Sequence, residues 1–269
     1  MMPQTQRLSD GSTLRWIEAG PNPGSGEPLL LIHGVGMRAE AWAPQMRLPG
    51  RVIAVDMPGH GGTSALAEGA LLPDYVAWAA LATQALGLHS ANVAGHSMGA
   101  LVALGLAASH PDKVHRLALL NGVHRRSPEA RAAVVARAEA IASGAFDLEA
   151  PLDRWFQPDE QTVRAQVSGW LAAVNRAGYA AAYRAFAEGD ATYAADLAHL
   201  SCPALMLTGA DDPNSTAEMA RAMADAAPLG RAVVIENHRH MVNLTAPDAV
   251  NAALTDWLRL PLSKMEKRA

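Results

Sequence analysis

The sequence predicts an α/β fold with a mostly parallel central sheet and helices on both faces of that sheet. Short runs that are apolar on both sides alternate along the chain with helical stretches, which is typical of a buried parallel sheet. The chain has 269 residues, of which 50% are hydrophobic, so it can bury one large core. Nothing in it resembles a long linker. We therefore expect one α/β domain with an insertion.

Seven strand-like runs carry this prediction. They lie at residues 13–18, 29–32, 52–55, 92–94, 117–120, 204–207 and 232–235. Helical patterns stand between or beside these runs at residues 73–86, 100–109 and 216–226. Because strand and helix alternate, most strands are expected to run parallel, with the helices packed on the two faces.

The alternation stops between residues 124 and 199. This segment contains no convincing strand and is predicted to form helices at 129–142, 159–175 and 180–188, with interruptions at Gly144, Pro151, Pro158 and Gly178. We expect a helical lid at 124–199, inserted between the two parts of one core, 1–123 and 200–269. The lid holds eight of the thirteen Phe, Trp and Tyr residues, which predicts an apolar, partly aromatic roof over the site.

Charge and targeting signals favour a small-molecule partner. The formal net charge is −4, so no basic surface for nucleic acid is predicted. The N-terminal residues 1–7 lack the pattern of a signal peptide, and the single cysteine, Cys202, has no internal disulfide partner; both features favour a cytoplasmic location. The longest stretch of small apolar residues, 94–108, is too short for a membrane span, so no membrane partner is expected.

A Gly-x-Ser-x-Gly pattern stands at the junction of a predicted strand and a predicted helix. Residues 95–99 read GHSMG, after the strand at 92–94 and before the helix at 100–109. In this context the pattern is typical of the nucleophile elbow of a serine hydrolase, which presents the Ser97 hydroxyl at the top of the sheet. A side chain at position 95 or 99 is expected to collide with the neighbouring strand or helix. The alternative is a glycine-rich junction in which Ser97 is structural.

Candidates for an acid and a base follow later strands. Acyl transfer by serine needs a base for the hydroxyl proton and an acid that orients the base, and in this fold the order is nucleophile, acid, base. Asp211 and Asp212 leave the predicted strand at 204–207, whereas His238 and His240 follow the strand at 232–235. We favour Asp212 as the acid and His240 as the base. The neighbours Asp211 and His238 remain the alternatives.

Two backbone amides are predicted to form an oxyanion hole. They are the N–H of Met98, directly after the nucleophile, and the N–H of Val35, in a glycine-rich loop after the strand at 29–32. His33 and His60 are expected to be structural histidines that hold this region. The ten histidines show none of the helix spacings of a metal site, so neither a metal nor another cofactor is expected.

Five motifs together resemble those of the α/β-hydrolase superfamily. They are residues 33–36 (HGVG), 56–61 (DMPGHG), 95–99 (GHSMG), 209–212 (GADD) and 240–247, in the superfamily's order and approximate spacing over nearly the whole chain. The pattern places the acid three residues after a glycine and the base seven residues before a proline, which selects Asp212 and His240. Thr245 stands where many relatives carry glutamate, a departure that concerns helix packing.

The predicted lid looks like that of 3-oxoadipate enol-lactonases. Residues 154–156 (RWF), Val163, 170–171 (WL) and 178–180 (GYA) carry this resemblance, and residues 33–42 have the spacing of the enol-lactonase oxyanion loop. The resemblance implies hydrolysis of a small lactone or ester, including one that bears a carboxylate. Trp155 is the expected pocket residue. Arg154 is either an anchor for a substrate carboxylate or one half of a solvated salt bridge.

The sequence thus predicts a serine hydrolase that cleaves a small carboxylic ester or lactone through an acyl-enzyme, without a cofactor. One alternative is a carbon–carbon hydrolase of vinylogous diketones, a group that usually carries asparagine just before the serine and in the oxyanion loop. This chain has His96 and Pro44 at those positions. The other alternative is a receptor-like member of the fold that binds a ligand with little turnover.

Overall fold

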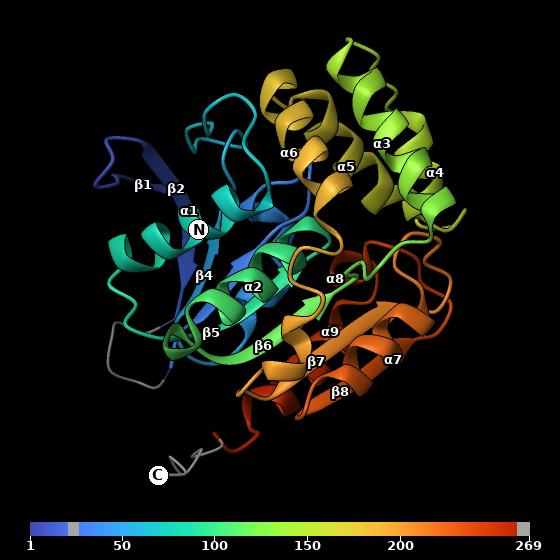
Figure 1. Ribbon diagram of the computed structural model, residues 1–269. Helices are drawn as coiled ribbons and strands as arrows, with labels where there is room; N and C mark the ends of the chain where they lie inside the picture. Colours follow the sequence, from blue (N-terminus) through green and yellow to red (C-terminus); the bar gives the residue numbers. More distant parts are fainter. Residues whose placement is uncertain (21–26, 263–269) are drawn as a thin grey trace.

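The computed structural model describes residues 1–20 and 27–262, which fold around one eight-stranded sheet (Figure 1). The strands from β3 to β8 run parallel, whereas β1 and β2 form an antiparallel edge. Their order across the sheet is β1 (Gln4–Arg7), β2 (Thr13–Ala19), β4 (Val52–Val55), β3 (Leu29–Ile32), β5 (Ala91–His96), β6 (Val114–Leu120), β7 (Ala204–Gly209) and β8 (Gly230–Ile235). The α/β fold with a mostly parallel sheet is confirmed.

Helices cover both faces of the sheet, and each face has its own apolar core (Figure 1). One face packs against α1 (Leu72–Ala85), α2 (Met98–Ser109) and α7 (Ala217–Ala226). The other face packs against α9 (Pro247–Leu258) and the 3-10 turns η1 (Ala39–Trp42) and η2 (Gln45–Arg47). A short helix, α8 (Val242–Thr245), and a 3-10 turn, η3 (Pro111–Lys113), complete these layers. Of the helices that the structure describes, none combines the length and hydrophobicity that a membrane crossing requires.

Four helices stand between β6 and β7 and gather at one end of the sheet (Figure 1). They are α3 (Pro128–Ala142), α4 (Glu149–Trp155), α5 (Gln161–Ala172) and α6 (Arg176–Gly189), followed by the turn η4 (Asp196–His199). This part of the chain is fully described and contains no strand, as the sequence predicted. The boundaries of a lid at 124–199 stay a prediction.

Two of the expected interruptions in this segment are wrong. Pro151 lies in the first turn of α4, where a proline is tolerated because the missing N–H would have no helical partner. Gly178 lies in the first turn of α6, against Gly59 of the loop after β4. A Cβ at position 178 would stand 2.2 Å from the Gly59 carbonyl oxygen, so glycine is required for the close approach of two backbones.

Candidate active site

Ser97 occupies a strained turn between β5 and α2. Its backbone has φ 55° and ψ −118°, a conformation that a residue with a side chain rarely adopts. The flanking glycines make the turn possible: a Cβ on Gly95 would lie 2.0 Å from the Gly99 carbonyl oxygen, and one on Gly99 would lie 2.2 Å from the Ile32 carbonyl oxygen. The predicted collisions therefore occur, and Ser97 stands at the carboxyl end of a central strand.

Asp212 and His240 meet at the same end of the sheet. Both side chains are buried, and His240 Nδ1 lies 2.7 Å from Asp212 Oδ2. The carboxylate also accepts hydrogen bonds from Asn121 Nδ2 at 2.8 Å and from the Asn214 backbone N–H at 2.8 Å. Burial acts to raise the pKa of Asp212, but the charge and hydrogen bond of His240 and the two amide donors lower it below its ordinary value. An ionised Asp212 can thus hold His240 with Nε2 free to accept a proton.

The two neighbours that the sequence offered as alternatives point elsewhere. Asp211 is exposed and accepts a hydrogen bond from Gln157 Nε2 at 2.8 Å. His238 Nδ1 lies 3.0 Å from Glu160 Oε1 and 2.9 Å from Thr245 Oγ1. Neither side chain lines the cavity in front of Ser97. The geometry therefore supports the acid and base roles for Asp212 and His240.

His96 joins the serine turn to the backbone of the candidate base. Its Nε2–H donates to the His240 carbonyl oxygen at 2.8 Å, and the centroids of the two rings are 5.0 Å apart. Complete burial, followed by the charge of His240, lowers the pKa of His96 to about 3. The ring is thus neutral and serves as a hydrogen-bond donor at physiological pH.

The loop after β3 is held by the two histidines that were expected to be structural. His33 accepts from the Met57 N–H at 2.9 Å, and His60 accepts from the Gly36 N–H at 2.9 Å. Each ring also donates through Nδ1 to a backbone carbonyl, and burial lowers the pKa of both, which matches two neutral imidazoles. Val35 lies between these anchors and lines the same cavity as Ser97.

The amide of Met98 is the other predicted oxyanion donor. Met98 is the first residue of α2, and the first N–H groups of a helix have no acceptor inside the helix. An amide at this position is free to bind an anion, and the helix dipole favours negative charge there. Met98 directly follows Ser97, and Val35 lines the same cavity as Ser97; the oxyanion hole formed by their two amides stays a prediction.

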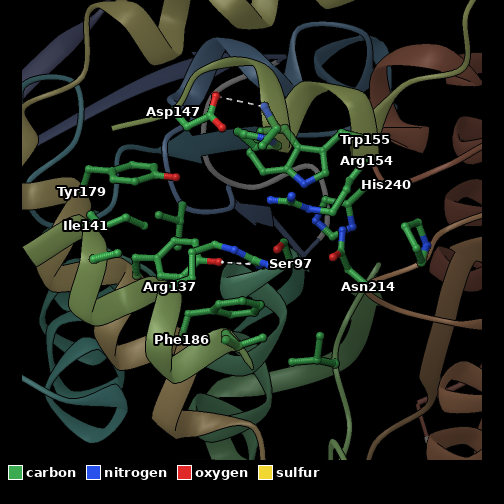
Figure 2. Close-up of a pocket in the computed structure, with 18 of the residues that line it drawn as sticks. Ser97, Arg137, Ile141, Asp147, Arg154, Trp155, Tyr179, Phe186, Asn214 and His240 are labelled. Carbon is green, nitrogen blue, oxygen red and sulfur yellow. Dashed lines mark hydrogen bonds between the residues drawn. The ribbon is translucent and has the colours of Figure 1, made fainter. Parts of the chain in front are cut away.

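A cavity of about 450 Å³ lies in front of Ser97 and His240 (Figure 2). Most of its wall comes from α3, α4, α6 and the α3–α4 connection, and five aromatic side chains contribute to it: Phe146, Trp155, Tyr179, Tyr183 and Phe186. The Trp155 ring stacks on the His240 ring, with centroids 5.8 Å apart and an interplanar angle of 27°. Trp155 thus lies in the pocket where the sequence placed it.

The cavity is strongly positive for its size. Three arginines line it, and Asp147 is the single acidic side chain among its described lining residues. Arg126 is already paired with the buried Asp190 at 3.3 Å. Arg137 donates to the Tyr183 hydroxyl at 3.2 Å, and Arg154 forms no ion pair or hydrogen bond within residues 1–20 and 27–262. The expected alternative of a solvated salt bridge for Arg154 is therefore wrong.

Figure 2 shows the guanidinium groups of Arg137 and Arg154 directed toward the space in front of Ser97. Burial and the neighbouring charge of Arg137 lower the pKa of Arg154, which shows that the two cations repel each other. An anion placed between them would relieve that repulsion. The sequence indicated Arg154 but not Arg137, because nothing in the sequence shows that α3 and α4 face each other across one cavity.

No group of side chains in the described part of the chain has the composition of a metal site.

The chain belongs to the alpha/beta hydrolase family, whose model matches residues 29–253. The resemblance to this superfamily and the fold class are thus confirmed.

One relative and two solved structures narrow the comparison. The (E)-2-((N-methylformamido)methylene)succinate hydrolase of Acinetobacter baylyi is 51% identical over 263 residues, which are 96% of this chain and 98% of the relative. The enol-lactonase of Burkholderia xenovorans superposes with a TM-score of 0.82 at 26% identity, covering 96% of this chain and 100% of its own. A thermophilic esterase of Thermogutta terrifontis, solved with malate bound, gives a TM-score of 0.84 at 27% identity over 96% and 98% of the two chains.

These comparisons confirm a hydrolase with enol-lactonase-like relatives, but not the ester or lactone bond that the sequence predicted. The compound in the name of the Acinetobacter protein is an N-formyl enamine of a dicarboxylic acid and contains neither bond.

Proposed function

We propose that the protein is a serine hydrolase that acts on a small dicarboxylate through an acyl-enzyme, with the N-formyl enamine of the Acinetobacter relative as its first candidate substrate. The observation that carries this proposal is the pair of guanidinium groups, Arg137 and Arg154, in the Ser97 cavity without an acidic partner among the described residues. Half-buried cations without a counter-charge have lost part of their hydration, and a substrate carboxylate is the natural group to neutralise them.

The proposed reaction begins at Ser97. His240 takes the hydroxyl proton while Ser97 Oγ attacks the formyl carbon, and the N–H groups of Val35 and Met98 stabilise the oxyanion. Asp212 keeps His240 in the required tautomer and stabilises the imidazolium. The bond from the formyl carbon to nitrogen then breaks, and the nitrogen of the leaving group receives the proton from His240. Water activated by His240 releases formate and restores the Ser97 hydroxyl.

The arginines would hold the acid groups of the substrate in this scheme. A dicarboxylate has two negative charges, and Arg137 and Arg154 supply two positive charges in the same cavity. Hydrogen bonds between charged groups are stronger than neutral ones, so this contact would fix the substrate with its acyl group near Ser97. The 51% identity to the relative over nearly both full lengths supports the same substrate class.

A second candidate is a carboxylate-bearing ester or lactone. The chemistry at Ser97 would be the same, since both bonds yield an acyl-enzyme. The similarity to an enol-lactonase favours this candidate, and the malate in the Thermogutta esterase is a dicarboxylate bound to a protein of this fold. Both candidates share the anionic substrate and differ in the bond that is cut.

A matched substrate panel separates these candidates. It contains the N-formyl enamine dicarboxylate, its diester, enol-lactones with and without a carboxylate, p-nitrophenyl acetate and a vinylogous diketone. The proposal predicts the highest kcat/KM for the dicarboxylate and a loss of about 10- to 100-fold for its uncharged diester.

Each other outcome assigns a different function. Preference for the carboxylated lactone selects the second candidate. Preference for the diketone establishes the carbon–carbon hydrolase alternative. Well-folded protein that gives neither turnover nor an acyl-enzyme burst with p-nitrophenyl acetate would favour the receptor-like alternative and overturn the proposal.

A further inference from the structure

The residues that flank the candidate acid and base bind one short segment of the helical layer above the sheet. Asp211, next to the acid, accepts from Gln157, and His238, two residues before the base, contacts Glu160. The third contact comes from Arg239, which directly precedes His240. The four partner residues, Asp153, Phe156, Gln157 and Glu160, all lie at the end of α4 and in the turn into α5.

Arg239 makes the most specific of these contacts. Its Nη1 donates to the Asp153 carbonyl oxygen at 2.7 Å and to the Phe156 carbonyl oxygen at 3.0 Å. These carbonyls belong to the C-terminal end of α4, where acceptors have no partner within the helix and the helix dipole is negative. The Arg239 side chain thus caps α4 with a positive charge.

The capped helix carries the two pocket residues that the sequence predicted. Arg154 and Trp155 are the last two residues of α4, and both line the cavity. Trp155 stacks on His240, so α4 touches the base directly as well. A helix of seven residues has little stability of its own, which makes its orientation dependent on such tertiary contacts.

The main chain of Arg239 is also linked to the candidate acid, Asp212, through the side chain of Asn121. Its carbonyl oxygen accepts a hydrogen bond from Asn121 Nδ2 at 3.4 Å, and the same amide donates to Asp212 at 2.8 Å. One residue therefore contacts the substrate-facing helix through its side chain and the acid–base pair through its backbone.

We propose that Arg239 is a positioning residue that sets the orientation of α4, and thereby of Arg154 and Trp155, relative to His240. It does not touch the substrate. Its guanidinium fixes the helix end, so that the carboxylate anchored by Arg154 and the acyl carbon attacked by Ser97 are held at a constant separation. This inference rests on the proposed function for its kinetic consequence, whereas its structural consequence does not depend on the substrate.

The kinetic test uses Arg239→Met, which keeps the length of the side chain but removes the donors, and Arg239→Lys, which keeps the charge. For the dicarboxylate, Arg239→Met is expected to raise KM about 10-fold, because Arg154 is no longer held in place, and Arg239→Lys to recover part of that loss. The kcat/KM for p-nitrophenyl acetate, which has no carboxylate for Arg154, should change less than about 3-fold. Arg259→Met, at a side chain that is 76% exposed directly after the end of α9, serves as the control.

A double-mutant cycle distinguishes positioning from a general disturbance. If Arg239 acts through Arg154, adding Arg239→Met to Arg154→Met should raise KM less than 2-fold further. Additive effects, or equal losses on the dicarboxylate and on p-nitrophenyl acetate, would overturn the inference.

Hydrogen exchange tests the same inference without a substrate. In Arg239→Met the amides of α4 should exchange at least 10-fold faster than in the wild type, while those of α2 remain unchanged. Unchanged exchange in α4 would overturn the inference. Failure of the wild type to hydrolyse the dicarboxylate would overturn the proposed substrate instead. The exchange measurement uses no substrate, so its result does not depend on that outcome.

Discussion

At the residue scale, two pairs of near neighbours with the same chemistry have different surroundings. Asp212 and His240 are buried against each other, whereas Asp211 and His238 contact the α4–α5 turn. Composition alone does not separate the members of each pair. The course of the backbone separates them. It directs Asp212 and His240 toward each other at the end of the sheet, and Asp211 and His238 toward the helices above it.

Substitution of the two histidines tests this difference. His240→Gln should lower kcat by about 10⁴- to 10⁶-fold, because the base is lost, while His238→Gln should stay within about 10-fold of wild type. Both variants are compared by steady-state kinetics with p-nitrophenyl acetate, after thermal melts show that they fold. A larger loss for His238→Gln than for His240→Gln would show that His238, and not His240, is the base.

The arginines make a second prediction at this scale. Arg137→Met and Arg154→Met should each reduce kcat/KM for the dicarboxylate by about 10- to 100-fold, the value of one charge-assisted hydrogen bond, and leave p-nitrophenyl acetate nearly unaffected. Arg184→Met is a matched control, because this exposed arginine pairs with Glu188 on the outer side of α6. Equal losses on both substrates would argue against carboxylate binding.

Sequence patterns identified the residues with a fixed place in the chain and missed those defined by packing. Ser97, Asp212 and His240 each follow a strand, and motif spacing locates them. Asn121, which donates to Asp212, also follows a strand but belongs to no recognisable motif. Arg137 faces the pocket only because α3 lies beside it, and helical periodicity in a segment of mixed polarity does not show which face that is.

At the element scale, the close contact of β3, the serine turn and α2 limits what can be substituted. Gly99→Ala should destabilise the protein by about 3 kcal/mol, since its Cβ would stand 2.2 Å from a backbone oxygen that cannot move aside. Gly169→Ala is the control in exposed space on α5, where alanine should stabilise by about 0.5–1 kcal/mol. Urea unfolding measures both; similar free energies of unfolding for the two variants would contradict the geometry.

Among the elements that the sequence analysis did not predict, β1 and α4 were missed for clear physical reasons. All four residues of β1 are exposed and polar, so no alternation of buried and exposed positions marks it as a strand. The helix α4 is short and contains Pro151, which suggested a break, although a proline in the first turn is compatible with a helix. The core strands were predicted well because burial on both faces leaves a continuous apolar run.

At the scale of the whole molecule, buried neutral histidines make stability depend on pH. The pKa of His96 is lowered to about 3 in the folded protein, chiefly by burial, against 6.5 in the unfolded chain. Between these values the unfolded chain binds the extra proton, so the free energy of unfolding falls as the pH falls. His33 and His60, with pKa values lowered in the same direction, add to this slope.

Replacing His96 tests the pH dependence directly. From pH 5.5 to pH 4.5 this residue accounts for a loss of about 1.3 kcal/mol in the free energy of unfolding, and His96→Asn should remove that part of the loss. Urea unfolding at the two pH values gives the difference for each protein. Identical pH slopes for wild type and variant would contradict a neutral buried imidazole.

The arrangement of the molecule as a whole explains why the site forms where it does. The carboxyl ends of β3, β5, β6, β7 and β8 meet at one edge of the sheet, and each is followed by a residue of the site. The helices α3, α4 and α6 then close a positively charged cavity over that edge. The order of the strands makes the position of the site residues at these strand ends predictable from the sequence, whereas the charge of the cavity depends on how the helices pack.

The proposed reaction is tested most directly by the hydrolysis of (E)-2-((N-methylformamido)methylene)succinate by wild type and by Ser97→Ala, measured as release of formate. We expect turnover by the wild type and a loss of about 10⁶-fold in the variant. Absence of turnover in folded wild-type protein, or a Ser97→Ala variant that keeps a tenth of the wild-type rate, would contradict the proposed reaction.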